Sequence, residues 1–181
     1  MTVLGLAIAL ARPGHALTLE LPAPILSEET RSEVPGSYDV PIGPFADGAL
    51  PTLTVEGAVS QRALQLDAPG QTTLAVFAPL RDQVIAAGFE VLLDCEDRVC
   101  GGFDFRYGTE VLAEPDMHVD LGDFRFLSAT RGDEAVTILV SRSALSAYVQ
   151  ITRVTAAPVV GTASDMPPLP VIDMATAPDL A

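Results

Sequence analysis

The chain has 181 residues, of which 49% are hydrophobic and 19% are charged, so it suits one globular domain with flexible ends and is short for two. Its formal net charge is −14, and all 10 basic residues are arginine. Binding to nucleic acid or to anionic lipid relies on clustered cations. The composition therefore argues against a nucleic-acid partner and against simple electrostatic adhesion to a membrane.

The first sixteen residues are typical of a short secretory signal. Val3 to Ala11 is continuously apolar, and Gly14-His15-Ala16 places small residues where signal peptidase cleaves. We expect a signal peptide over residues 1–16 and a mature chain that begins at Leu17. No segment approaches the ~20 apolar residues of a transmembrane helix. No cysteine follows the apolar stretch, which argues against a lipoprotein anchor.

Three further segments differ in composition. Residues 17–52 are rich in proline, glycine, serine and acids, which predicts an irregular lead-in. Residues 53–155 carry periodic apolar signals and form the predicted domain. Residues 156–181 consist largely of alanine, proline and aspartate without a pattern, as in a disordered tail or linker. A linker with nothing after it suggests that the chain once preceded another module or that a longer protein has been cut.

The first half of the predicted domain reads as strand, helix, strand. Apolar and polar residues alternate over residues 61–67, which predicts a half-buried strand. Thr72 or Thr73 caps a predicted helix that runs to about Ala87, before Gly88. Pro79 would interrupt this helix, so its regular part is expected to begin at residue 78. Alternation over residues 89–95 predicts the next strand.

The second half reads as antiparallel strands. Phe103, Phe105 and Tyr107 would share one face of an extended segment, and further strands are expected over residues 121–128, 135–141 and 147–154. Turns at residues 130–133 and 141–143 would connect the last three. The predicted fold class is α+β: a twisted, mostly antiparallel sheet with one main helix packed on it and one disulfide.

Cys95 and Cys100 close a small loop between apparent strands. In an exported chain this pair should be oxidised, so we expect a structural disulfide. Gly101 and Gly102 would permit the turn that follows. The alternatives are a redox pair, which more usually has Cys-x-x-Cys spacing, or half of a zinc site, for which two further ligands are missing.

Residues 110–123 contain a second cluster of polar side chains. Carboxylates at alternating spacing could bind calcium, although the glycine and final glutamate of an EF-hand loop are not in place. An edge strand over residues 117–121 explains the same alternation. The weak metal candidates are Glu114, Asp116, His118, Asp120 and Asp123. No cofactor is expected.

The residues argue against the commoner catalytic mechanisms. His118 is the only histidine outside residues 1–16, so a Ser-His-Asp triad would depend on it, and no serine lies in a Gly-x-Ser-x-Gly pattern. Two of the 24 acidic residues could form a glycosidase pair, but the chain has no tryptophan and only 3 tyrosines for stacking on sugars. We expect no enzymatic activity.

Several stretches resemble the uncharacterised domain that precedes OmpA-like peptidoglycan-binding domains in alphaproteobacterial envelope proteins. They are Val55-Glu56-Gly57 with Arg62, Leu80-Arg81, Ala86 to Leu92, Cys95, Cys100 to Phe103, and Pro115 to Ser128. The resemblance covers about residues 38–155. It implies the periplasm, near the outer membrane or cell wall, and supplies no catalytic residues. The OmpA-like module that would bind peptidoglycan is not in this chain.

These observations predict a noncatalytic, envelope-associated interaction domain of an OmpA-family-like protein. Its partner would be an envelope protein or an outer-membrane component, and peptidoglycan association would need a module that this chain lacks. The first alternative is a periplasmic module that binds a small ligand or calcium through residues 114–123. The second is a cell-wall hydrolase with two unrecognised carboxylates.

Overall fold

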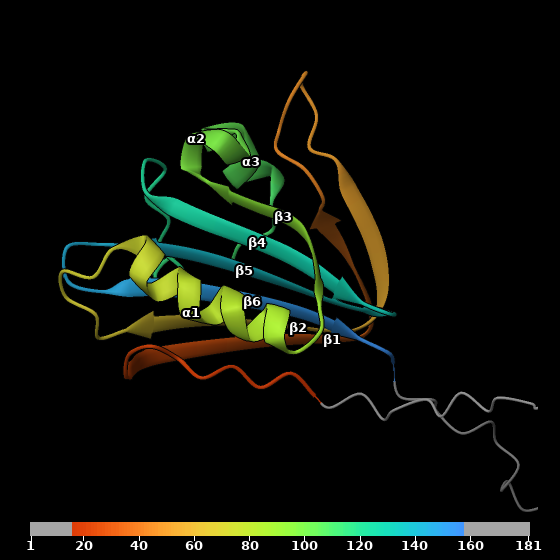
Figure 1. Ribbon diagram of the computed structural model, residues 1–181, viewed down its shortest axis with the longest axis horizontal. Coiled ribbons are helices and arrows are strands. Elements are labelled where there is room, and N and C mark those ends of the chain that lie inside the picture. The colour runs from red at the N-terminus through yellow and green to blue at the C-terminus, as the bar shows by residue number, and fades with distance from the viewer. Residues whose placement is uncertain (1–15, 158–181) are drawn as a thin grey trace, which may run out of the picture.

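The computed structural model describes residues 16–157, which form an α+β fold built on one six-stranded antiparallel sheet (Figure 1). The order of strands across the sheet is β1-β2-β6-β5-β4-β3. The elements are β1 (Ile25–Pro41), β2 (Thr52–Leu66), α1 (Thr73–Ala86), β3 (Glu90–Glu96), α2 (Asp97–Cys100), α3 (Gly102–Gly108), β4 (Phe124–Arg131), β5 (Glu134–Arg142) and β6 (Ala147–Thr155). The predicted fold class is confirmed.

The predicted ends of the chain fall almost entirely outside this structure. The expected signal peptide overlaps the described residues only at Ala16, and the expected tail only at Ala156 and Ala157. Within residues 16–157, no helix is both long enough and apolar enough to cross a lipid bilayer.

Helix α1 covers one face of the sheet, as Figure 1 shows. Thr72 caps the helix, because its Oγ1 accepts a hydrogen bond from the Ala75 amide at 3.1 Å. Apolar residues of α1 pack against alternate residues of β2, β6, β5 and β4, which gives the larger of the two main cores. Its fully buried helix residues are Val76, Phe77, Leu80 and Val84.

Proline inside α1 does not delay the start of the helix. The helix begins at Thr73 and passes through Pro79, so the expected start at residue 78 is wrong. Pro79 lies on the exposed side of the helix, where water can solvate the carbonyl that loses its amide partner. Val76 and Phe77 meanwhile hold the first turn against the core.

The segment predicted as an irregular lead-in contains the longest strand. Residues Ile25–Pro41 form β1, which pairs with β2 along nearly its whole length. The prediction was wrong because residues 25–35 are exposed on both faces, so they show none of the alternation that marks a half-buried strand. β1 is also an edge strand, where proline and charged residues are tolerated.

The β1–β2 hairpin bends, and its far end rises toward α2 and α3 (Figure 1). The pairing shifts register between Glu33 and Gly36. At Gly57 the backbone approaches β6 so closely that a Cβ atom would lie 2.2 Å from the Thr155 carbonyl oxygen. Beyond the bend, the Ser128 hydroxyl donates a hydrogen bond to the Pro41 carbonyl. The hairpin therefore curls over the sheet face opposite α1.

Residues 103–107 form a helix rather than an extended segment. Gly101 and Gly102 have positive φ angles of 119° and 58°, and they redirect the chain from α2 into α3. The helical period separates the three aromatic residues: Phe105 is buried, whereas Phe103 and Tyr107 are 59% and 66% exposed. The expectation that all three share one face is corrected accordingly.

A second core fills the sheet face opposite α1. Phe105 packs against Phe124 and Phe126 of β4, and Met117 from the loop before β4 joins them. This loop, residues 109–123, contains no strand, so the predicted edge strand is absent and β4 begins at Phe124. Gln150 of β6 fixes the loop: its side-chain amide accepts from the Leu112 amide at 2.8 Å and donates to the Glu110 carbonyl at 2.9 Å.

Candidate functional site

The structure does not bring the five weak metal candidates together. Glu114 pairs with His118, whose Nδ1 lies 2.8 Å from the Glu114 Oε1. The Asp120 carboxylate accepts a hydrogen bond from the Gly122 amide at 2.9 Å. Asp116 belongs to a turn in which its amide donates to the Ala113 carbonyl. Among residues 16–157, no three histidine, cysteine or acidic side chains are placed to hold a metal ion.

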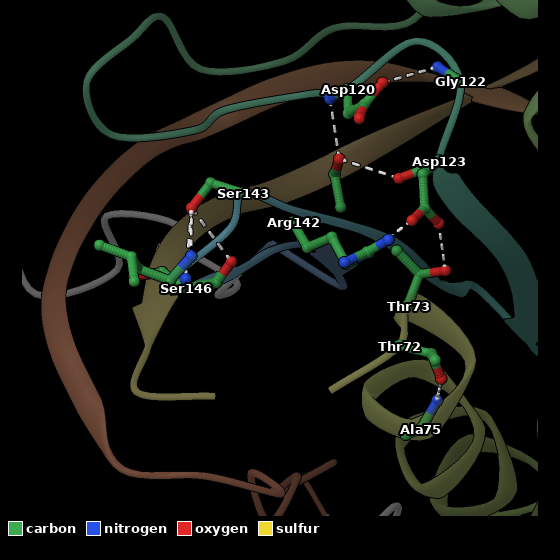
Figure 2. Close-up of polar contacts among 11 residues, drawn as sticks. Thr72, Thr73, Ala75, Asp120, Gly122, Asp123, Arg142, Ser143 and Ser146 are labelled. Atoms are coloured by element: carbon green, nitrogen blue, oxygen red, sulfur yellow. Dashed lines mark hydrogen bonds and ion pairs between the residues drawn. The ribbon is translucent and has the colours of Figure 1, made fainter. Parts of the chain in front are cut away.

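Asp123 is the acidic residue of this stretch with the most partners, and Figure 2 shows it between the start of α1 and the end of β5. Its Oδ1 accepts from the Thr73 hydroxyl at 2.6 Å, and its Oδ2 accepts from Arg142 Nε at 2.5 Å. The Asp123 carbonyl accepts a hydrogen bond from the Ser141 hydroxyl, and this hydroxyl in turn accepts a hydrogen bond from the Asp120 amide. These contacts tie the loop to the helix and to the sheet, which is a structural role.

The same contacts set the pKa of Asp123. Partial burial acts to raise it, but the hydrogen bonds from Thr73 and Arg142 and the charges of Arg142 and Arg125 outweigh burial, so the pKa lies below its ordinary value. The carboxylate also lies at the first residue of α1, where the helix dipole favours negative charge. The ionised form therefore stabilises the folded protein.

Replacing Asp123 by asparagine is expected to lower the free energy of unfolding by about 1–2 kcal/mol at neutral pH. Because the pKa is lower in the folded state, this stabilisation is present at neutral pH and is lost as the pH falls through the folded-state pKa. Urea denaturation between neutral pH and about pH 3 should show wild type and D123N converging in acid. The control is D133N, at an exposed turn residue; equal stability of the two variants at neutral pH would contradict the role of Asp123.

The disulfide predicted for Cys95 and Cys100 is present, with the two Cα atoms 5.2 Å apart. Cys95 is the penultimate residue of β3, and Cys100 is the last residue of α2. The Cys100 carbonyl accepts a hydrogen bond from the Phe45 amide at 2.7 Å, which attaches the tip of the β1–β2 hairpin to the same point. The disulfide thus fixes the position of α2 and of the helix that follows it.

The side chains of Phe103 and Tyr107 form an exposed aromatic patch on α3. Their ring centroids are 4.4 Å apart, and the Arg106 guanidinium lies 5.4 Å from the Tyr107 ring centre. Val99 on α2 is also 63% exposed. Aromatic side chains left in water on a rigid element contribute little to the core and are typical of protein contact surfaces. The aromatic patch is therefore the candidate functional site.

Sequence reasoning missed this patch because it placed Phe103, Phe105 and Tyr107 on one strand face. The signal was present in the Cys-Gly-Gly sequence before Phe103: two glycines at positive φ end α2 and allow the helical turns of α3 to begin. At helical spacing, residues 103 and 107 lie together and residue 105 lies apart.

These features define a disulfide-containing α+β domain with an exposed aromatic patch. No protein-family model matches the chain, and no curated protein was found to match its sequence.

Proposed function

We propose that the protein is a noncatalytic interaction domain of the bacterial cell envelope, which acts in the periplasm near the outer membrane. The partner is another envelope protein, which contacts the aromatic patch of Phe103 and Tyr107. The observation that carries this proposal is the exposure of both rings on a helix anchored by the disulfide. Aromatic residues supply much of the binding energy in protein interfaces, since they bury large areas with few rotatable bonds.

Three further features support the proposed location. A disulfide persists in an oxidising compartment such as the periplasm, and the first sixteen residues are typical of an export signal. The resemblance to domains of OmpA-family envelope proteins points to the same compartment. The deficit of basic residues favours a protein partner over a lipid headgroup or nucleic acid.

The test is co-sedimentation of the full oxidised chain with outer-membrane vesicles from an alphaproteobacterium, with purified peptidoglycan sacculi as a separate arm. We expect saturable binding to the vesicles that protease treatment of the vesicles abolishes. The double variant F103S/Y107S should bind at least tenfold more weakly, which corresponds to a loss of about 1.4 kcal/mol.

The matched control is L145S, because Leu145 is 75% exposed and lies in the β5–β6 turn, outside the aromatic patch. It should bind as the wild type does. Unchanged binding of F103S/Y107S would show that the aromatic patch does not contribute to the interaction. Failure of the wild type to sediment with either material would contradict envelope affinity in this domain.

A further inference from the structure

A cavity of about 420 Å³ lies between the segment before β1 and the strands β1, β2 and β6. This volume falls within the range of small-molecule sites, about 300–1,000 Å³. Leu17 and Ile151, which line it, also belong to the core beneath α1. Leu19 and Val34 extend the apolar part of the lining. The cavity is lined by neither residue of the aromatic patch, so a ligand in it would leave Phe103 and Tyr107 accessible.

Two arginines give this cavity a cationic wall. Arg62 on β2 and Arg153 on β6 both line it, and the pairing of Arg62 with Ile151 and of Ser60 with Arg153 places them diagonally on adjacent strands. The chain has a net charge of −14, so two arginines side by side on the wall of a partly apolar cavity contrast with its overall charge. Anionic groups are therefore the ones that this wall favours.

The charge on Arg153 is only partly compensated. Its Nη1 donates to the Leu17 carbonyl at 2.8 Å, and within residues 16–157 it has no carboxylate within 4.0 Å. Burial lowers the pKa of Arg153. The negative charge of Glu134 acts to raise this pKa, whereas the positive charges of Arg131 and Arg62 lower it further. Arg62 is paired through its Nε with Glu28, which leaves the other guanidinium nitrogens as possible donors. An anion beside Arg153 would offset the cost of burying its charge.

We propose that this cavity binds an amphipathic anion: an acyl chain packed against Leu17, Leu19 and Ile151, with its acidic group held by Arg153 and Arg62. Guanidinium groups bind carboxylates and phosphates through paired hydrogen bonds, and the apolar lining removes the chain from water. The ligand is either a free fatty acid or the acyl portion of an anionic lipid, because both present this chemistry.

Calorimetric titration of the full chain with decanoate below its micellar concentration tests the proposal. We expect saturable binding with one site per chain. R153Q should bind decanoate at least tenfold more weakly but bind decanol, which has no charge, as the wild type does. The control is R98Q, which removes an exposed arginine from α2, away from the cavity.

Two further variants test the same site in case R153Q does not fold. R62Q should also weaken decanoate binding, and S60L, which places a larger side chain in the cavity lining, should weaken both decanoate and decanol. Thermal unfolding of each variant checks the fold. Absence of decanoate binding by the wild type, or equal affinities of wild type, R153Q and R62Q, would overturn the proposal.

The source of the ligand is resolved by flotation with phosphatidylglycerol vesicles. Flotation that decanoate suppresses supports an anionic lipid as the ligand, and decanoate binding without flotation supports a free fatty acid. Retention of decanoate binding by F103S/Y107S shows that the two sites are separate. That variant also separates failure of this inference from failure of the proposed function.

Discussion

Replacing Gly57 by alanine is expected to lower the free energy of unfolding by about 3 kcal/mol, as for overpacked core positions. The added Cβ would lie 2.2 Å from the Thr155 carbonyl oxygen, well inside van der Waals contact. The carbonyl oxygen and carbon of Thr155 are backbone atoms, so rotation of the nearby Val154 side chain would not relieve this clash. β2 would have to move away from β6 where the hairpin bends, and several pairing hydrogen bonds would weaken.

Urea denaturation at neutral pH measures this effect. The control is G122A, because a Cβ at Gly122 would meet only the Asp120 carboxylate oxygen, at an ordinary 3.5 Å. We expect G122A to differ little from the wild type. If G57A and G122A unfold at the same urea concentration, then β2 and β6 do not approach as closely as described at this point.

Removal of the disulfide by the double change C95A/C100A is expected to lower the free energy of unfolding by about 2 kcal/mol under oxidising conditions. The bond spans a sequence separation of 5 and restricts the unfolded chain accordingly. It also secures α2, to which the hairpin tip is attached through Phe45. Amide hydrogen exchange in α3 and around Phe45 should therefore accelerate more than exchange in α1.

Reduced wild type is the matched reference for this variant, since it has the same unrestricted loop. Under reducing conditions, C95A/C100A and the wild type should unfold at similar denaturant concentrations. Equal stability of variant and oxidised wild type would show that the disulfide does not stabilise the fold. Uniform acceleration of exchange throughout the domain would contradict its local role in holding α2 and α3.

The parts of the fold that the sequence predicted have a recognisable cap or a dense run of apolar residues. α1 begins at Thr73 after the Thr72 cap, β6 matches its predicted range closely because its apolar residues largely alternate into a core, and β5 does so because it is an apolar run buried on both faces. β1 was missed since residues 25–35 are exposed on both faces. Its pairing with β2 is a long-range contact, which local periodicity does not encode.

The candidate site was less predictable than the fold. The disulfide was expected from two closely spaced cysteines in a chain predicted to be exported, and it is confirmed. The acidic stretch was a candidate metal site because its carboxylates are close in sequence. In the structure the Asp123 carboxylate accepts hydrogen bonds from Thr73 and Arg142, which lie 50 and 19 residues away in the sequence. Partners that are distant in sequence decide whether a carboxylate is available to a ligand. The cavity beside Arg153 likewise combines four separate segments.

The exposed outer edge of β1 has a consequence at high protein concentration. An edge strand offers unpaired amide and carbonyl groups to any second chain, and stacking of such edges can grow into filaments. Here the edge carries Glu28, Glu29 and Glu33 against a single arginine, Arg31, and Pro35 removes one amide donor. Two copies meeting edge to edge would bring carboxylates together. This charge pattern favours discrete particles over edge-to-edge polymerisation.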